Sequence, residues 1–598
     1  MCGIIGYIGS QHDPKEVLMW GLKHLEYRGY DSAGIAWLEK GKTRIEKCKG
    51  KISQLEKQIA DINVTGTIAL GHTRWATHGK PSTINAHPHQ VGDVTVVHNG
   101  IIENYIELKR KLIQEGYQFK SETDTEIIAC LIKKELEKAP LIERAVQNTL
   151  PQLKGSYAIV VMRESEPEKL VAAKYASPLV VGVGKNEFFL ASDIPALLKF
   201  TKDVVYMEDH EVAVLTPNRI QFFDENGDLV KKTPKKIKWS AQMVEKAGFP
   251  HFMLKEICEQ PQAIIHTLAD KINATQDKVE LPLSSDFFNN INKIYLTACG
   301  TAWHASLIGK YLLEKIAKRN VEVDLASEFR YREPLIGVGD LLIVTSQSGE
   351  TADSLAALQL AKSKGAKTLA ICNVKDSSIA RSADQVLYTE AGPEIGVAST
   401  KAFTTQVLIF NLIALYLAQS TDDVKELILG LTRVPLYMEQ VLNLAEQVKH
   451  IAHNHDKKIA ALFMGRDILY PVALEGALKL KEISYIHAHG YPAGEMKHGP
   501  IALVDKDLPV IALLANDSSF DKMMSNLEEV KAREGIVIAI SQKPVSLANE
   551  TIILPEGQWH TNPFIFAIPM QLLAYYIARF KGTDIDQPRN LAKSVTVE

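Results

Sequence analysis

The chain has 598 residues, of which 46% are hydrophobic and 23% are charged. At about 100 to 200 residues per domain, this predicts three or four globular domains and excludes both a single small domain and a disordered chain. Lys and Arg number 68 against 71 Asp and Glu, a net charge of -3. No long-range field attracts a polyanion, so we expect no nucleic-acid partner.

The cysteines and the N-terminal residues predict a protein that stays inside the cell. The six cysteines contain no C-x-x-C pair, which argues against a disulfide framework and a zinc ribbon. The first residues lack a basic segment followed by an apolar one, so we expect a cytoplasmic protein. The apolar runs at 407–418 and 564–578 are shorter than the ~20 residues that span a bilayer, which predicts two buried helices and no membrane contact.

Short β-rich runs dominate the first third of the chain, with a few amphipathic helices such as residues 105–117 between them. This pattern predicts a sheet-dominated α/β domain over residues 2–220. The basic, Pro-bearing stretch 231–239 has no apolar period and predicts an exposed connector, within a linker and connecting segment over residues 221–285.

Cys2 is the first candidate for catalysis. Removal of the initiator Met would leave Cys2 with a free α-amine, whose pKa near 7.7 to 8 lets it accept the thiol proton. Nucleophile and base would then belong to one residue. A cysteine at this position has no such meaning by itself, so the hypothesis depends on the motifs that follow.

Four motifs follow: RGYDSAG (28–34), GHTRWATHG (71–79), HNGIIEN (98–104) and TDTE (123–126). Together they resemble the N-terminal-nucleophile glutaminases of the class II amidotransferases, over nearly all of residues 2–220. The resemblance implies an αββα domain that hydrolyses glutamine at Cys2.

The residue types suit that reaction. Arg74 offers a planar fork for the α-carboxylate of free glutamine, and Asp124 can balance its α-ammonium. Asn99 and Gly100 follow a strand, where an amide side chain and an unhindered backbone N–H can hold an oxyanion.

By the resemblance, Thr77 and His78 belong to the glutamine shell, and Trp75 is the gate between the glutaminase site and an acceptor site. Core packing is the alternative for Trp75. Five histidines crowd this region, but their spacing matches no common zinc pattern and a metal would occupy the Cys2 thiolate, so we expect no metal site. They are His72, His78, His87, His89 and His98.

From about residue 290, short apolar strands alternate with helices, which predicts doubly wound parallel sheets. The pattern occurs twice, with an offset of 165 between Cys299–Gly300 and Met464–Gly465 and of 170 between Gly365 and Gly535. This indicates a duplicated α/β domain, over residues 286–428 and 429–585, followed by a catalytic tail over 586–598.

The first copy has a hydroxyl-rich SQSGET loop where a strand ends and a helix begins. Free backbone N–H groups, the helix dipole and the hydroxyls suit a phosphate monoester, although such loops are also ordinary helix caps. With AGPEIGVASTKAFTTQ (391–406), the loop resembles the sugar isomerase (SIS) domain. By this resemblance the sugar-phosphate pocket comprises Thr301, Ser346, Gln347, Ser348, Thr351, Val397 and Ser399.

The family commonly has a hydroxyl residue where this chain has Ala302, a departure that bears on one sugar-phosphate contact. In the second copy, Glu475, Lys479 and Glu482 lie at i, i+4 and i+7 of one helix, a spacing that by itself indicates an exposed ion-pair ladder. Two further segments carry chemistry: GEMKHGP, with His498, and the terminal DQPRNLAKSVTVE, with Lys593.

These last segments resemble the isomerase half of the glutamine:fructose-6-phosphate aminotransferase family, and with the glutaminase domain the resemblance covers the whole chain. It implies that His498 assists ring opening, Lys593 forms an imine with the ketose and Glu482 shuttles a proton, with Lys479 and Glu475 supporting the open-chain sugar. It also implies no cofactor, glutamine and fructose 6-phosphate as substrates, and a homodimer. A sugar-phosphate-binding regulator and another glutamine amidotransferase remain the alternatives.

Overall fold

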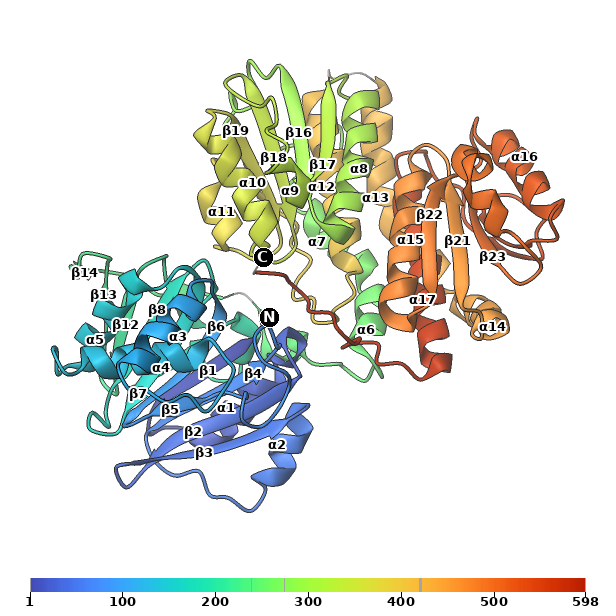
Figure 1. Cartoon of the computed structure of the whole chain (residues 1–598). Coiled ribbons are helices and arrows are strands. Elements are labelled where there is room, and N and C mark those ends of the chain that lie inside the picture. The colour runs from blue at the N-terminus through green and yellow to red at the C-terminus, as the bar shows by residue number, and fades with distance from the viewer. Residues whose placement is uncertain (1, 238, 274, 419–421, 597–598) are drawn as a thin grey trace. The chain divides into compact units, whose positions relative to one another are not determined.

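The computed structural model describes residues 2–237, 239–273, 275–418 and 422–596 (Figure 1). It forms two compact units, Met1–Glu245 with Ser594–Glu598, and Lys246–Lys593. Parts of the predicted segments therefore lie outside the described residues: Met1, Lys238 of the connector, Ala274 of the linker, residues 419–421 of the first duplicated domain and residues 597–598 of the tail.

The first unit contains two antiparallel sheets. The eight-stranded sheet has the order β15-β11-β9-β10-β1-β4-β2-β3. Its strands are β1 (Gly3–Gly9), β2 (Ser32–Glu39), β3 (Lys42–Lys49), β4 (Ile68–Arg74), β9 (Val180–Val183), β10 (Glu187–Ala191), β11 (Asp203–Tyr206) and β15 (Lys235–Lys236). Strand β1 is buried along its whole length, because it lies in the interior of this sheet between β10 and β4.

The seven-stranded sheet has the order β14-β13-β12-β8-β7-β6-β5. Its strands are β5 (His89–Val91), β6 (Val94–Ile102), β7 (Gly155–Arg163), β8 (Leu170–Tyr175), β12 (Val212–Thr216), β13 (Arg219–Phe223) and β14 (Leu229–Val230). The helices of this unit are α1 (Pro14–Lys23), α2 (Ile52–Gln58), α3 (Tyr105–Gln114), α4 (Thr125–Glu135) and α5 (Ile142–Thr149).

Three apolar clusters show how these elements are layered. One joins α1 and α2 to the first sheet, a second lies between the two sheets, and a third joins the second sheet to α4 and α5. Two sheets enclosed by helices on both sides form four layers, so the predicted αββα architecture is confirmed.

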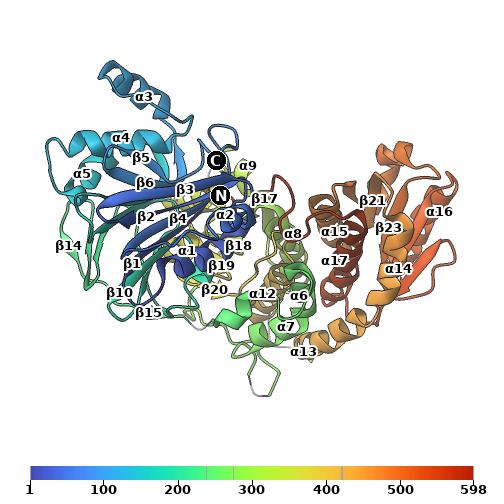
Figure 2. The same cartoon turned by 90° about the horizontal axis from the view of Figure 1, so that it is seen from below.

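The second unit contains two five-stranded parallel sheets, visible in Figures 1 and 2. Their orders, β17-β16-β18-β19-β20 and β22-β21-β23-β24-β25, follow the same pattern, which supports the predicted duplication. The strands of the first are β16 (Lys293–Ala298), β17 (Val321–Leu325), β18 (Asp340–Ser346), β19 (Lys367–Cys372) and β20 (Gln385–Tyr388). Those of the second are β21 (Ala460–Gly465), β22 (His487–Pro492), β23 (Pro509–Leu514), β24 (Ile536–Ser541) and β25 (Glu550–Ile553).

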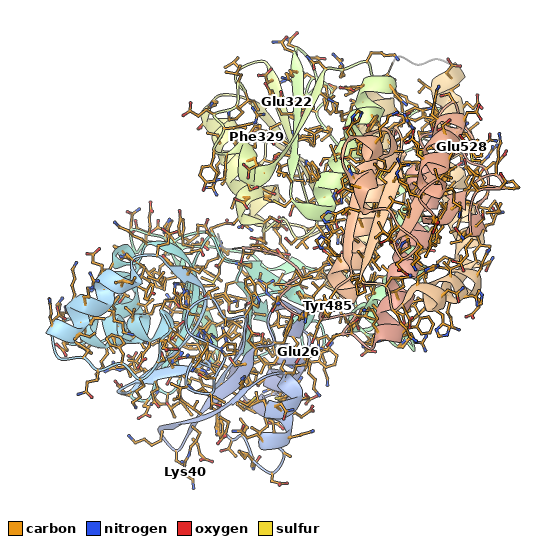
Figure 3. The ribbon with its side chains drawn as sticks, turned by 45° about the vertical axis from the view of Figure 1, so that its right-hand side comes forward. Glu26, Lys40, Glu322, Phe329, Tyr485 and Glu528 are labelled. Carbon is orange, nitrogen blue, oxygen red and sulfur yellow. The ribbon has the colours of Figure 1, made fainter. Side chains whose placement is uncertain are left out.

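Helices connect and cover these sheets. In the first copy they are α8 (Gly300–Lys315), α9 (Ala326–Phe329), α10 (Ala352–Ser363), α11 (Ser378–Ser382) and α12 (Lys401–Leu417), preceded by α6 (Phe252–Cys258) and α7 (Gln260–Leu268). In the second they are α13 (Asp422–Leu442), α14 (Ala445–His455), α15 (Leu469–Ser484), α16 (Phe520–Lys531) and α17 (Asn562–Lys581). Tyr485, labelled in Figure 3, ends α15 in the left-handed conformation at φ 60°.

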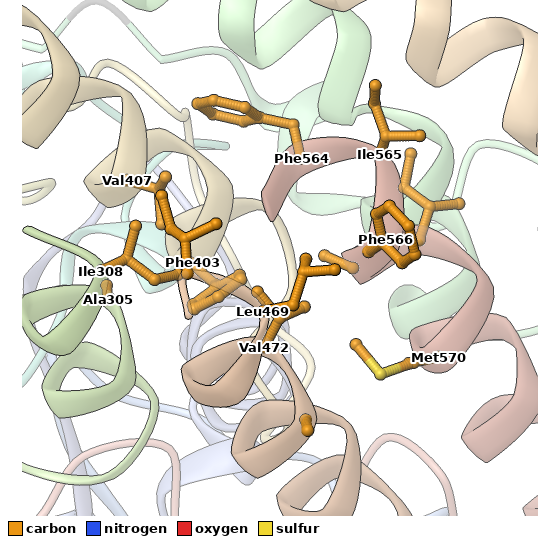
Figure 4. Packing of buried hydrophobic residues seen from close by; sticks show 14 of the residues in the cluster. Ala305, Ile308, Phe403, Val407, Leu469, Val472, Phe564, Ile565, Phe566 and Met570 are labelled. Atoms are coloured by element: carbon orange, nitrogen blue, oxygen red, sulfur yellow. The ribbon is translucent and has the colours of Figure 1, made fainter. Parts of the chain in front are cut away.

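One apolar core joins the two copies. Side chains of α8, α12, α15 and α17 pack together there, among them Ile308, Phe403, Leu469 and Phe564 (Figure 4). Helix α17 has 20 residues, longer than the predicted 564–578 run, and is by length and composition capable of crossing a bilayer. Because 89% of its apolar window is buried inside the protein, it is a core helix, as the sequence predicted.

Residues 221–285 contain more secondary structure than their composition indicated. Strands β14 and β15 pair with β13 and β11, and the compact unit extends to Glu245. The basic side chains of β15 are exposed, which explains why the segment shows no apolar period.

Candidate functional site

Cys2 directly precedes β1 and lines a small pocket with Arg28, Trp75, Asn99 and Gly100. The Trp75 N–H donates to the Cys2 Sγ at 3.4 Å, and the Cys2 carbonyl accepts from Arg28 Nε at 3.1 Å. Burial raises the pKa of the Cys2 thiol. The thiol therefore needs a base to become a nucleophile near neutral pH, and its own α-amine is the nearest group of suitable pKa once Met1 is removed.

The amide of Asn99 has hydrogen-bond partners on both ends. Its Nδ2 donates to the Cys2 carbonyl at 3.0 Å and to the Ser192 hydroxyl at 2.7 Å, while Oδ1 lies 3.1 Å from the His72 Nε2. Gly100 has φ 127°, and a Cβ there would lie 2.1 Å from a backbone oxygen of β7. Only glycine fits this approach. The prediction that Asn99 and Gly100 follow the strand is wrong, because β6 continues to Ile102 and includes both.

Arg74 ends β4 with half of its guanidinium engaged. The Nη2 donates to the backbone oxygens of His78 and Gly79, whereas the buried Nη1 has no hydrogen-bond partner among the described residues. Asp124 Oδ2 accepts the Ile102 N–H at 2.9 Å. The unsatisfied Arg74 Nη1 can donate to the α-carboxylate of a free amino acid, and the buried Asp124 carboxylate can accept from its α-ammonium.

The other predicted glutamine residues lie on the loop after β4. Trp75 and His78 are half-buried and Thr77 is exposed. The His78 ring packs edge-to-face on Tyr105 at 4.6 Å, and Thr77 lines the Cys2 pocket. Trp75 also lines this pocket, and it belongs to none of the three apolar clusters of this unit.

Four of the five histidines, all except His78, form a buried network. His72 stacks on His87 at 4.0 Å, and His87 lies 4.9 Å from His89. Burial lowers the pKa of all three and of His98, that of His72 to about 3. Over the described residues no group of three His, Cys, Asp or Glu side chains is arranged to hold a metal.

The SQSGET loop lies between β18 and α10. Ser346 and Thr351 hydroxyls are 3.0 Å apart, the Gly349 N–H donates to the Ser346 Oγ at 3.0 Å, and the Glu350 N–H donates to the Ser348 Oγ at 3.2 Å. Thr351 precedes α10 without capping it through its side chain. A compact hydroxyl loop at an uncapped helix N-terminus can accept a phosphate.

The strand order places this loop at a switch point of the sheet. Strands β16 and β18 are neighbours, so Thr301, after β16, and Ser346, at the end of β18, lie at the same carboxyl edge. Ligands of open parallel sheets bind at such edges. Gln347 is half-buried in the same loop.

Lys479 forms the centre of a buried charge cluster. Its Nζ lies 3.3 Å from Glu475 and 2.7 Å from Glu482, and donates to Thr301 Oγ1 at 3.1 Å. Burial lowers the pKa of Lys479, but the two carboxylates outweigh it and raise that pKa well above its usual value. Glu475 and Lys479 are about 1% exposed, so the exposed-ladder alternative is wrong.

His304 was not predicted, although it belongs to this cluster. Its Nδ1 lies 2.7 Å from Glu475, which also accepts from the Thr301 hydroxyl at 3.1 Å. The available signal is its position one turn after Thr301 on α8. Thr301 and His304 together connect the first sheet's edge to α15 of the second copy.

Lys593 is held by the segment between β20 and α12. Its Nζ donates to the buried carboxylate of Glu394 and to the Gly396 carbonyl at 2.8 Å. Glu394 also accepts from the Ser399 hydroxyl at 3.0 Å. The Val397 N–H donates to the Asp586 carbonyl oxygen at 3.1 Å. The predicted residues Val397 and Ser399 therefore lie on the segment that binds Lys593.

A second unpredicted carboxylate, Glu256, binds the same segment through the backbone N–H groups of Ile395 and Gly396. Burial, and then the charge of Glu394, raises the pKa of Glu256 to about 7. Burial acts in the same direction on Glu394, but Lys593 and the N–H groups at the start of α12 outweigh it and lower the pKa of Glu394 to about 2.

His498 has no contact with the other predicted site residues in the part of the chain that the structure describes. It is exposed at the end of the 3-10 helix Ala493–His498, with no hydrogen bond or ion pair to any residue that the structure describes.

Comparison with known proteins finds relatives for both the Cys2 domain and the two parallel-sheet domains. A glutamine amidotransferase domain matches residues 74–199, and SIS domains match residues 287–416 and 455–579. The chain is 48% identical, over the full length of both proteins, to the glutamine–fructose-6-phosphate aminotransferase (isomerizing) of Caldanaerobacter subterraneus subsp. tengcongensis, and 49% identical to that of Aquifex aeolicus. This chain belongs to the glutamine–fructose-6-phosphate aminotransferase family.

A solved structure agrees with this assignment. The C-terminal domain of glucosamine-fructose-6-phosphate aminotransferase from Francisella tularensis covers 57% of this chain and is itself covered completely, with 41% identity and a TM-score of 0.55. The predicted family, the combination of glutaminase and SIS folds and the class of glutamine-dependent aminotransferase are therefore confirmed. The roles of individual residues in this aminotransferase stay predictions, as do the exact domain boundaries.

Proposed function

We propose that this chain converts L-glutamine and D-fructose 6-phosphate into L-glutamate and D-glucosamine 6-phosphate, a reaction of amino-sugar biosynthesis. The observation that supports this above all is that relatives matching the chain from end to end are named glutamine–fructose-6-phosphate aminotransferase (isomerizing). The half-buried Cys2 thiol in its pocket and the hydroxyl loop at a sheet switch point agree with that activity. The first suits amide hydrolysis and the second suits a sugar phosphate.

In the first half-reaction, the Cys2 thiol transfers its proton to the α-amine and attacks the glutamine side-chain carbonyl. Asn99 and the Gly100 N–H stabilise the oxyanion. The carbon–nitrogen bond breaks as the amine proton passes to the leaving ammonia. Water then hydrolyses the thioester and releases glutamate. The unsatisfied Arg74 Nη1 and the Asp124 carboxylate hold the two charged ends of glutamine.

In the second half-reaction, the loop binds the phosphate and His498 assists opening of the sugar ring. The Lys593 amine forms an imine at C2 with loss of water, and ammonia displaces the lysine. Glu482 then carries a proton from C1 to C2 while the O1 hydroxyl proton passes to the nitrogen, which converts the ketose imine into the amino aldose. Lys479, with a carboxylate on either side, holds this proton carrier 2.7 Å away.

The decisive experiment measures glutamate and glucosamine 6-phosphate together after incubation with both substrates. Equal amounts of the two products, both abolished in Cys2→Ala, support the coupled reaction. In Lys593→Ala we expect glutamate without amino sugar. Glutamate without amino sugar from the unmodified chain contradicts the proposed acceptor.

We also propose that ammonia passes between the two sites with Trp75 as its gate. In Trp75→Ala the yield of amino sugar per glutamine hydrolysed then falls below one, and an unchanged yield contradicts the gate. A homodimer in the cytoplasm completes the proposal. Analytical ultracentrifugation tests the dimer, and cell fractionation tests the location.

A further inference from the structure

His72 is a fully buried residue of β4 whose hydrogen-bonding direction can be deduced. Its Nε2 lies 3.0 Å from the His98 carbonyl oxygen and 3.1 Å from the Asn99 Oδ1. A backbone carbonyl can only accept, so Nε2 carries the hydrogen. The Asn99 atom that shares this hydrogen must also be an acceptor, which is its oxygen.

The opposite end of Asn99 gives the same answer independently. Its Nδ2 faces the Cys2 carbonyl at 3.0 Å, another group that only accepts, and the Ser192 hydroxyl at 2.7 Å. That hydroxyl oxygen also accepts the Ile4 N–H at 2.7 Å. If the amide were turned over, its NH₂ would face the N–H of His72 and its oxygen would face the carbonyl oxygen of Cys2. Two donors would then meet at one end and two acceptors at the other, which is unfavourable between buried groups.

The state of His72 keeps this arrangement constant with pH. Burial lowers its pKa to about 3, so the ring is neutral and keeps a single N–H over the range in which enzymes work. The stacked His87, 4.0 Å away, restrains the ring plane. His87 itself hydrogen-bonds to Thr125 at 3.2 Å and not to Asn99.

We propose that His72 is a positioning residue for glutamine hydrolysis, which fixes the Asn99 amide with its oxygen turned away from Cys2 and its NH₂ directed towards it. The inference rests on the proposed function, in which Cys2 attacks and Asn99 stabilises the oxyanion. Because that charge exists only in the transition state, a loss of orientation lowers kcat and leaves KM for glutamine nearly unchanged.

The test compares His72→Phe and His72→Gln in the full chain, with glutamate release as the readout. We expect kcat to fall about 30-fold to 100-fold in His72→Phe, with KM changed less than about threefold. His72→Gln keeps an N–H donor and should recover most of that loss. The matched control is His87→Phe, which makes the same change at a neighbouring buried histidine, keeps an aromatic ring to stack on His72 and should keep kcat within about threefold.

A double-mutant cycle shows whether His72 acts through Asn99. In an Asn99→Ala background, His72→Phe should lower kcat less than about threefold further. The inference is overturned if the kcat losses of the two single substitutions multiply in the double variant. It is also overturned if His72→Phe has a normal kcat or changes only the KM for glutamine. If His72→Phe does not fold, His72→Met replaces it in the same comparison. Glutamate release that survives Cys2→Ala refutes the proposed function itself, whereas its loss together with a normal His72→Phe refutes only this inference.

Discussion

The amine of Lys593 and the carboxylate of Glu394 form a buried ion pair, although the two residues are 199 positions apart. Glu394 is fully buried, and its other oxygen accepts the N–H groups of Thr400 and Ala402 at 2.9 and 3.0 Å. One side chain therefore both caps α12 and holds the lysine that we propose forms the imine.

Glu394→Gln should impair the second half-reaction and the stability of the second unit. The amide leaves a buried lysine without its counter-charge, which costs about 3 to 5 kcal/mol, so calorimetry should show a lower Tm. Amino-sugar formation should fall by more than about tenfold while glutamate release continues. The matched control is Glu446→Gln, which breaks the exposed Lys449–Glu446 pair and should cost about 1 kcal/mol or less. Equal effects of the two substitutions contradict a special role for Glu394.

Gly349→Ala should disrupt the SQSGET loop. Gly349 has φ 66°, and a Cβ there would lie 1.9 Å from the Ser377 Oγ. The control is Gly582→Ala, which has nearly the same φ of 67° but no atom within 4 Å of its Cβ. Both carry the cost of a left-handed alanine, about 1 kcal/mol, so the difference isolates the clash. We expect the KM for fructose 6-phosphate to rise about tenfold or more only in Gly349→Ala, and equal KM values for the two variants would be evidence against this.

The sequence predicts the site residues that belong to short contiguous motifs. It does not predict contacts between residues that are far apart in the chain. Cys2, Arg74 and Asn99 belong to contiguous motifs, so their types alone indicate their chemistry. Glu256 reaches Gly396 across 140 positions and contacts backbone N–H groups, which have no residue type to recognise. Periodicity placed Lys479 on a helical stripe but could not show that α8 covers it. The length of α17 was underestimated because its polar ends continue the helix.

Glu256→Gln should change how the stability of the second unit depends on pH. The pKa of Glu256 is about 7 in the folded chain, against an ordinary value of 4.5. Between these values the unfolded chain has released the proton that the folded chain keeps, so stability falls as pH rises from about 4.5 to 7. Glutamine cannot ionise and still accepts from Ile395 and Gly396.

We therefore expect Glu256→Gln to gain about 2 kcal/mol relative to the unmodified chain between pH 5 and pH 7. Calorimetric Tm values at both pH values measure this gain. A constant difference between the two proteins across this range would mean that Glu256 is ionised when folded. The lowered pKa of Glu394 acts in the opposite sense. Its contribution to the stability of the folded chain is full above about pH 4.5 and is lost as pH falls towards 2.

The buried histidines should make the first unit sensitive to acid. Their pKa values are lowered by burial, that of His72 to about 3, while an unfolded histidine titrates near 6.5. Below about pH 6.5 the unfolded chain binds more protons than the folded one. The stabilising effect of their neutral state is thus full above that pH and is lost progressively as pH falls towards the folded values, at up to ~1.4 kcal/mol per pH unit for each ring.

His89→Gln tests this directly, because it removes one titrating ring and keeps a polar partner for the Thr123 hydroxyl, now 3.1 Å from His89 Nε2. We expect the variant to lose less stability than the unmodified chain between pH 7 and pH 5, with a slope smaller by about one proton. The temperature at which glutamate release is irreversibly lost, measured after brief heating at each pH, reports on this unit alone. Parallel pH profiles for the two proteins would show that His89 is already protonated in the folded state, and the acid sensitivity would then need another origin.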